Sequence, residues 1–231
     1  MLSKVATLAL FPVDDPSAFG VVVTDGSGRI TQFVEKPSRD IIKTLGKSYI
    51  NAGIYVLEPE VLDLIEPGEV TSFEYDVFPK LLNLGMPFFG YQMSQNYWRD
   101  IGSPQSYLAA HMDCLAGIVA MEDSSPSSNS TENSGAMISE DCFIGSDTQI
   151  TNSVIGPGVH VEPNAHIESS VIWSNTRISA MSRIDSSVVG DGCHVGKHIH
   201  LTNVVLGEKT FLADYSRFTG PSQDGRDEIC T

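Results

Sequence analysis

Two short segments near the start of the chain carry side chains that could bind a polar ligand. Residues 33–37, Phe-Val-Glu-Lys-Pro, place Glu35 and Lys36 at the end of an expected strand, which the proline then stops. Residues 51–53, Asn-Ala-Gly, begin another expected strand. The amide of Asn51 can both donate and accept hydrogen bonds, and the small residues Ala52 and Gly53 would let a ligand approach the backbone. A plain ion pair at the strand end is the simpler interpretation of Glu35 and Lys36.

A third segment, residues 97–102, carries a single carboxylate between an aromatic pair and a glycine. Asp100 lies just before an expected helix. A carboxylate in this place could bind a hard cation. It could equally be an acidic residue that stabilises the N-terminus of a helix.

These segments lie in residues 1–115, whose pattern of strand and helix signals is typical of a mixed α/β domain. Alternating and apolar runs predict strands at 5–11, 20–24, 29–34, 50–57 and 86–93. Residues 25–28 form a turn between the second and third of these strands. Helical spacing is found at 59–65, 73–84 and 104–115, and Thr71 with Glu74 makes a capping box for the second helix.

The segment that follows is rich in serine and asparagine. Residues 116–136 include the stretch Ser-Ser-Pro-Ser-Ser-Asn-Ser-Thr-Glu-Asn-Ser-Gly, which cannot form a packed core, so we expect a flexible linker at 116–136. Residues 219–231 are expected to form a tail.

Residues 137–218 are a repeat. Aliphatic residues recur at spacings of 6, 6 and 5, which gives a period of 17 residues, and a second set four positions later is mostly small or apolar. This rhythm is typical of a parallel β-helix with three short strands per turn, in which the aliphatic residues fill the interior and the small residues let the corners close. The aliphatic residues are Ile138, Ile144, Ile150, Ile155, Val161, Ile167, Ile172, Ile178, Ile184, Val189, Val195, Leu201, Leu206 and Leu212.

Positions five after an aliphatic residue should point outward and stack from turn to turn. One such ladder is Phe143, His160, Arg177, His194 and Phe211, and the next is Gln149, His166, Arg183, His200 and Arg217. Each contains the order His-Arg-His. The ladders could be solvated faces, or a basic stripe that docks on an acidic surface of a neighbouring subunit.

The overall composition excludes several classes of partner. The 231 residues have a net charge of −15, so neither nucleic acid nor an anionic membrane surface is expected as a partner. No apolar run reaches the roughly 18 residues of a membrane span. The four cysteines are widely spaced and form no CxxC pair, which suits reduced thiols in a cytoplasmic protein.

The order of the motifs resembles that of a known enzyme family. Five blocks, at residues 16–22, 34–37, 51–55, 73–79 and 97–102, followed by hexapeptide coils, resemble the sugar-1-phosphate nucleotidyltransferases, also called sugar-nucleotide pyrophosphorylases. The motifs Asn-Ala-Gly-Ile-Tyr and Trp-x-Asp-Ile-Gly are most similar to those of the members that transfer guanylyl groups to mannose-1-phosphate. The resemblance implies an α/β domain of partial Rossmann-like form and a left-handed β-helix.

The resemblance also implies roles for particular residues. It places the backbone of Gly20 against a sugar, and it assigns Glu35 and Asn51 to the sugar hydroxyls, with clearance provided by Ala52 and Gly53. It assigns Lys36 to the phosphate of a sugar-1-phosphate and Asp100 to Mg²⁺. The implied reaction is attack of the sugar phosphate on a nucleoside triphosphate, with release of pyrophosphate. Glu74 fits the family block and the capping box equally well.

One family feature is not found in the sequence. The glycine-rich triphosphate loop and a second metal-binding Asp, both expected before the first of the five blocks, do not occur. We therefore expect that this chain does not catalyse the reaction alone, and that it is a truncated gene product, one half of a split gene or the product of an incompletely predicted gene. Two alternatives stay open: a non-catalytic subunit for regulation or assembly, which would associate with itself or with a full-length subunit through the β-helix, and a hexapeptide-repeat acyltransferase.

Overall fold

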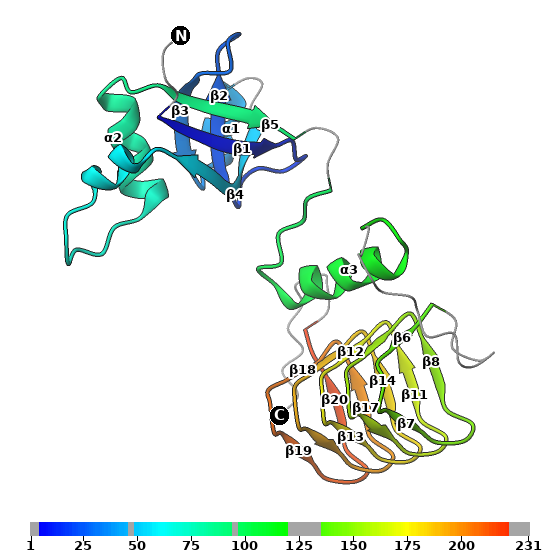
Figure 1. The fold of residues 1–231 in the computed structure, drawn as a ribbon. Coiled ribbons are helices and arrows are strands. Elements are labelled where there is room, and N and C mark those ends of the chain that lie inside the picture. The colour runs from blue at the N-terminus through cyan, green and yellow to red at the C-terminus, as the bar shows by residue number, and fades with distance from the viewer. Residues whose placement is uncertain (1–4, 46–48, 94–96, 120–134, 222–231) are drawn as a thin grey trace. The chain divides into compact units, whose positions relative to one another are not determined.

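The computed structural model describes residues 5–45, 49–93, 97–119 and 135–221 (Figure 1). The chain divides into two compact units, Met1–Trp98 and Arg99–Thr231, and each is described by itself. The helix expected at 104–115 belongs by its contacts to the second unit. The expected domain boundaries remain predictions, and most of the expected linker and tail lies outside the described residues.

The first unit is built on a mixed sheet of five strands. Their order across the sheet is β3-β2-β4-β1-β5, with β1 and β5 parallel and the other neighbours antiparallel. The five strands expected from the sequence are all present, within two residues at each end. They are β1 (Ala6–Phe11), β2 (Gly20–Thr24), β3 (Ile30–Glu35), β4 (Tyr49–Leu57) and β5 (Phe88–Gln92).

The helices of this unit differ from expectation. The helix expected at 59–65 is the 3₁₀-helix η1 (Pro59–Leu64), and that expected at 73–84 is a π-helical turn, η2 (Phe73–Val77), continued by α2 (Phe78–Asn83). A short helix, α1 (Arg39–Leu45), was not predicted; it has no buried residue, so no apolar pattern marks it.

The predicted capping box was wrong by one residue. The cap is Ser72, whose Oγ accepts hydrogen bonds from the backbone N–H groups of Glu74 and Tyr75, at 3.2 Å each. In return, the backbone N–H of Ser72 donates a hydrogen bond to the carboxylate of Asp76, at 2.8 Å. The carboxylate lies four residues after the cap instead of three because the first turn is the wider π turn.

An aromatic cluster forms the core between the sheet and these helices. The ring of Phe78 lies 5.2 to 5.7 Å from four others, and both Phe78 and Phe88 are fully buried. The four partner rings come from β3, β4, η2 and β5, so the cluster ties the helix to the sheet next to the ends of β3 and β4. These rings are Phe33, Tyr55, Phe73 and Phe88.

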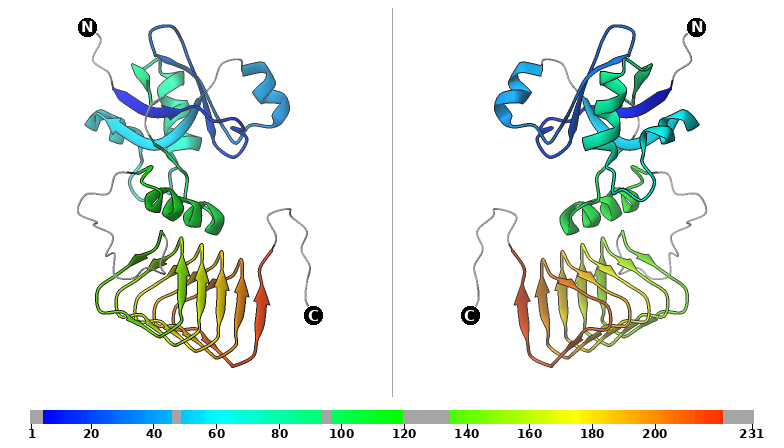
Figure 2. Two further views of the ribbon diagram at one scale, coloured as in Figure 1. Left: turned by 90° about the vertical axis from the view of Figure 1, so that its right-hand side faces the viewer. Right: turned by 90° about the vertical axis from the view of Figure 1, so that its left-hand side faces the viewer.

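The second unit begins with helix α3 (Pro104–Leu115), whose N-terminus is capped by the Oγ of Ser103. A parallel β-helix follows, in which strands 17 residues apart stack in register to form three flat sheets (Figure 2). One sheet comprises β6 (Met137–Ile138), β9 (Val154–Ile155), β12 (Val171–Ile172), β15 (Val188–Val189) and β18 (Val205–Leu206).

The other two sheets complete each turn. The second comprises β7 (Phe143–Ile144), β10 (His160–Val161), β13 (Arg177–Ile178), β16 (His194–Val195) and β19 (Phe211–Leu212). The third comprises β8 (Gln149–Thr151), β11 (His166–Glu168), β14 (Arg183–Asp185), β17 (His200–Thr202) and β20 (Arg217–Thr219). The repeat predicted from the spacing is thereby confirmed.

The predicted aliphatic residues fill the interior of the β-helix. From Ile150 to Leu201 they are 0–2% exposed, while those of the outermost turns are partly buried. The tightest corner holds a ladder of buried serines. Ser153, Ser170 and Ser187 each accept a hydrogen bond from the backbone N–H of the next turn at 3.0 to 3.1 Å, and the last of these donors is Val204.

The prediction that small residues close every corner needs one correction. In the short segment the residues four after the aliphatic are Val154, Val171 and Val188, and these belong to strands and point outward. The corner is closed instead by the serine one position earlier, because the five-residue spacing shifts the register. The outward valines lie under helix α3, beside Tyr107 and His111.

Candidate functional site

Three of the residues singled out in the sequence lie in one row across the sheet of the first unit. Glu35 on β3 pairs directly with Gly20 on β2. The antiparallel register of β2 and β4, which pairs Val21 with Ile50, continues toward Asn51 as the next neighbour of Gly20. Residues directly opposite one another on neighbouring strands share a face, so the carboxylate and the amide flank a position that has no side chain.

The carboxylate of Glu35 is poorly matched with its surroundings. Its Oε2 is buried and has no hydrogen-bond partner among the described residues. A Cβ on Gly20 would lie 2.6 Å from this oxygen, so only glycine fits beside it. Burial raises the pKa of Glu35, the charge of Glu74 raises it further, and Lys36 opposes the rise. A buried acceptor without a donor is costly for folding and therefore points to a ligand that supplies the donor.

The amide of Asn51 is held in one orientation. Its Oδ1 accepts a hydrogen bond from the N–H of Gly53 at 3.1 Å, and its Nδ2 donates to the hydroxyl of Tyr55 at 2.9 Å. That hydroxyl donates in turn to Oε1 of Glu74 at 2.9 Å, and Ser72 donates to the other oxygen at 3.0 Å. Burial raises the pKa of Tyr55 to about 12, so the phenol stays protonated and can donate.

Ala52 and Gly53 lie where β4 departs from regular pairing. Between the pairs Leu8–Tyr55 and Leu10–Asn51, one residue of β1 faces three of β4, so the residues after Asn51 bulge out of the ladder. Gly53 has a φ of 76°, which a residue with a side chain adopts only with strain. The carbonyl of Ala52 accepts a hydrogen bond from the indole of Trp98 at 3.0 Å.

Trp98 attaches the end of the first unit to the sheet beside these residues. Its ring lies 5.5 Å from that of Phe11 and 5.8 Å from that of Phe19, the residue just before Gly20. Trp98 therefore contacts β1, β4 and the residue before β2.

Lys36 is exposed, and its backbone turns out of the strand. Its φ of 45° breaks the ladder, and its N–H donates to the carbonyl of Phe19 at 3.0 Å. The ammonium group has no ion-pair partner among the residues that the structure describes. The simpler interpretation, an ion pair with Glu35, is not seen, and the cation is available to an anionic ligand.

Asp100 belongs to the second unit, so the structure does not place it relative to the row of Glu35, Gly20 and Asn51. Its side chain is exposed, and its carbonyl accepts a hydrogen bond from the hydroxyl of Ser106 in the first turn of α3. Within residues 5–45, 49–93, 97–119 and 135–221, no three His, Cys, Asp or Glu residues come together as metal ligands. Asp100 could supply one ligand, and Mg²⁺ would need the others from phosphate and water.

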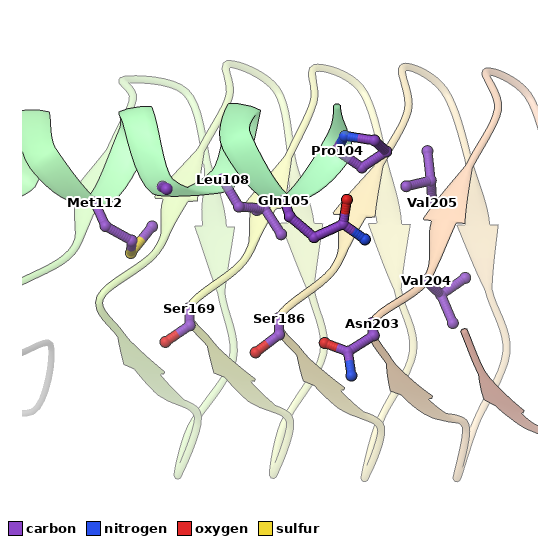
Figure 3. Close-up of a pocket in the computed structure, with 10 residues that line it drawn as sticks. Pro104, Gln105, Leu108, Met112, Ser169, Ser186, Asn203, Val204 and Val205 are labelled. Atoms are coloured by element: carbon purple, nitrogen blue, oxygen red, sulfur yellow. The ribbon is translucent and has the colours of Figure 1, made fainter. Parts of the chain in front are cut away.

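Within the second unit, a groove of about 210 Å³ lies between α3 and the β-helix (Figure 3). Figure 3 shows Gln105, Leu108 and Met112 of the helix above the corner residues Ser169, Ser186 and Asn203. The groove is lined by none of the residues that the sequence singled out for ligand binding.

The two outward ladders of the β-helix stack as the sequence predicted. His160, Arg177 and His194 pair rung by rung, and so do His166, Arg183 and His200. The first ladder is not a basic stripe, because the positive charge of Arg177 is paired with the carboxylate of Glu162. The hydrogen bond from Arg177 holds the pKa of Glu162 below its usual range.

Sequence reasoning gave no role to Tyr55 or Trp98. Both fall inside the quoted motif blocks, and Tyr55 is the fourth residue after Asn51. The signal that could have found Tyr55 is its phenol group on a mostly apolar strand, since a buried hydroxyl needs a hydrogen-bond partner.

Known proteins share both halves of this architecture. A family model described as nucleotidyl transferase matches residues 2–117, and the model of the EIF2B subunit epsilon LbH domain, a left-handed β-helix, matches residues 118–217. Mannose-1-phosphate guanylyltransferase of Mycobacterium tuberculosis is 34% identical over 183 residues, covering 75% of this chain and 46% of the relative.

Two further relatives show a similar match. UTP–glucose-1-phosphate uridylyltransferase of Synechocystis is 32% identical over 189 residues, covering 74% of this chain and 48% of the relative. Probable mannose-1-phosphate guanylyltransferase 2 of Arabidopsis thaliana is 33% identical over 197 residues, covering 74% and 50%. The chain thus spans about half the length of these relatives. With half of its residues matched by the family model, the chain belongs to the nucleotidyl transferase family.

Proposed function

We propose that the first unit binds a sugar-1-phosphate, with mannose-1-phosphate as its ligand. The observation that carries this proposal is the buried, unpaired Oε2 of Glu35 beside Gly20, in one row with the oriented amide of Asn51. Sugar hydroxyls are donors that a carboxylate and an amide can both bind. The names of two relatives above favour mannose, and that of the third, glucose.

Each residue of the row has a part in holding the sugar. The carboxylate of Glu35 would accept hydrogen bonds from hydroxyls, and charge-assisted bonds of this kind are stronger than neutral ones. The free lone pair and the free N–H of Asn51 would bind a further hydroxyl, while Gly53, where a side chain would meet no other atom, leaves room for the ring. Lys36, exposed at the end of β3, would bind the phosphate as a compact positive charge.

For the whole protein we propose nucleotidyl transfer, in which the bound sugar phosphate attacks the α-phosphorus of GTP and pyrophosphate leaves. The P–O bond to the sugar phosphate forms as the bond to pyrophosphate breaks, so catalysis depends on in-line positioning and on neutralised charge. The part of this chain is to fix the sugar phosphate in place. Mg²⁺ held with the help of Asp100 would neutralise phosphate charge.

A non-catalytic subunit is the second candidate. The observation that favours it is the match of the β-helix to a model named after a subunit. Binding of nucleotide separates the two candidates, because an enzyme must bind GTP and a subunit that only holds the sugar need not. Equilibrium dialysis of the full chain with GTP and with mannose-1-phosphate measures both.

Lys36→Ala tests the proposed phosphate contact. The variant should bind mannose-1-phosphate more weakly by about 1.5–3 kcal/mol, the usual size of a charge-assisted hydrogen bond. Binding of unphosphorylated mannose should stay the same. Lys43→Ala, on the exposed face of α1, is the matched control. Equal losses for mannose and for its phosphate would contradict the assignment of Lys36.

We further propose that the protein works in the cytoplasm. Cys114, Cys142 and Cys193 are free thiols, which persist in a reducing compartment. Among the described residues, no helix is long and apolar enough to cross a membrane.

A further inference from the structure

The sheet formed by β7, β10, β13, β16 and β19 presents an outward ladder that reads the same from either end. In register, the five rungs are Phe143, His160, Arg177, His194 and Phe211. Arg177 is the middle rung, with a histidine and then a phenylalanine on each side. We call this surface the palindromic face. The other sheets have no such order: the ladder next to it runs from Gln149 to Arg217.

The palindromic face exposes large apolar side chains at both ends. Phe143 is 53% exposed and Phe211 67%. The corner that borders the face exposes two more, Met181 at 50% and Tyr215 at 76%. Apolar residues gathered in this way on a soluble protein commonly mark a contact surface.

The middle of the face is close to neutral. The Nε of Arg177 donates to Oε1 of Glu162 at 3.0 Å, and Oε2 of the same carboxylate accepts from the N–H of Ala180, so the charge of the middle rung is paired within the chain. The two histidines lie against the end rungs, with ring centroids 4.4 Å apart for Phe143 and His160 and 5.1 Å apart for His194 and Phe211.

We propose that the palindromic face is a self-association surface, and that its partner is the same face of a second copy with the ladder reversed. A two-fold axis lying in the interface along the strand direction brings each rung opposite its mirror rung. Phe143 then meets Phe211 of the other copy, and the two Arg177 rungs meet at the axis. Such a contact is isologous, so it closes as a dimer.

The residues two positions after each rung are small, with one exception. They are Gly145, Glu162, Ser179, Gly196 and Ala213, and the reversed pairing sets Glu162 opposite Gly196 and small residues opposite one another elsewhere. Glu162 is the one long side chain in this second ladder, and its carboxylate is held within its own chain by Arg177 and by the N–H of Ala180. The pairing also brings Met181 to the axis against Met181 of the second copy.

The size and charge of the face predict a weak dimer that salt strengthens. Five rungs at about 4.8 Å span roughly 20 Å, less than a stable interface needs, so we expect a Kd of about 10–100 µM. Each copy carries a charge of −15, and salt screens the repulsion between copies. A basic stripe docking on an acidic surface would show the opposite dependence, with association weakened by salt.

Sedimentation of the full chain tests the surface. The weight-average mass should rise above the 25.0 kDa of one chain as the concentration approaches about 100 µM, and more so in 0.3 M than in 0.05 M NaCl. Phe143→Ser with Phe211→Ser should raise the Kd at least about tenfold. The matched control is Gln149→Ser with Arg217→Ser, at the same rungs of the next sheet. A wild-type chain that stays monomeric, or equal losses in both variants, would overturn the proposal.

Cysteine cross-linking tests the reversed register. The four native cysteines are first replaced, by Cys114→Ala, Cys142→Thr, Cys193→Thr and Cys230→Ser. Two variants of this cysteine-free protein are then made separately, one with Phe143→Cys and the other with Phe211→Cys. Thr148 and Thr176 occupy equivalent corners and form the same bonds as Cys142 and Cys193, so the background should fold. Mixing the two proteins should give a disulfide-linked heterodimer, and neither alone should cross-link. Cross-linking of either protein to itself, without the heterodimer, would overturn the reversed pairing.

Discussion

At the scale of single residues, the candidate site has a feature that stability alone would not favour. The carboxylate of Glu35 is placed where burial and the charge of Glu74 both oppose its ionisation, and one of its oxygens has no donor within the described part of the chain. Gly20 leaves the space that makes this arrangement possible. Carboxyl groups whose pKa is perturbed in this way are common at binding sites.

Glu35→Gln should therefore stabilise the first unit near neutral pH. The pKa of Glu35 in the folded chain is raised above its ordinary value of 4.5, so as the pH rises past that value its ionisation costs folding free energy. Glutamine does not ionise, so the melting temperature should be higher than that of the wild type at pH 7. The difference should vanish below pH 4.5. Calorimetry at pH 4 and pH 7 measures this, with the exposed Glu60→Gln as control; an unchanged or lower melting temperature at pH 7 would argue against the assignment.

Tyr55→Phe should weaken the network that holds Asn51. The change removes a hydroxyl bonded to both Asn51 and Glu74, and a polar group left without its partner in a half-buried site costs about 1–3 kcal/mol. Urea denaturation measures the loss in free energy of unfolding. Tyr75→Phe, whose ring is 64% exposed, is the control and should change stability by less than about 0.5 kcal/mol. Equal losses of unfolding free energy for the two substitutions would show that the hydrogen bonds of Tyr55 do not stabilise the fold.

At the scale of elements, the strands and coils were the predictable part. Alternating and apolar runs located all five strands of the first sheet. The 17-residue period located every turn of the β-helix, because one buried aliphatic per strand must recur for the interior to fill. The sequence could not specify the π turn at Phe73–Val77, which depends on Ser72 and Asp76 capping each other across it. The row of Glu35, Gly20 and Asn51 depends on strand order, which alternation does not reveal.

Ser170→Ala should destabilise the β-helix through its buried serine ladder. The Oγ of Ser170 accepts from the N–H of Ser187 at 3.0 Å and donates to the carbonyl of Glu168 at 2.6 Å. Its removal leaves a buried N–H without a partner, at a cost of about 1–3 kcal/mol. The control is Ser174→Ala, at a half-buried position in the turn that follows β12. A calorimetric unfolding transition that both substitutions shift alike would contradict this role of the ladder.

At the scale of the whole molecule, the charge limits the partners. A net charge of −15 repels polyanions at long range, although a single well-placed cation such as Lys36 can still hold one phosphate. Fluorescence polarisation with a labelled RNA and a labelled DNA duplex should show no binding at 0.15 M salt. Saturable binding to either would mean that a local basic surface outweighs the overall field.

The central claim is that the first unit holds a sugar-1-phosphate through Glu35 and Asn51. Isothermal titration of the full chain with mannose-1-phosphate tests it most directly, using wild type, Glu35→Gln and the control Glu60→Gln. We predict saturable binding to the wild type and to the control, and binding at least about tenfold weaker to Glu35→Gln, since a charge-assisted hydrogen bond is lost. Equal affinity of all three proteins for mannose-1-phosphate, or no binding to the wild type, would contradict the account.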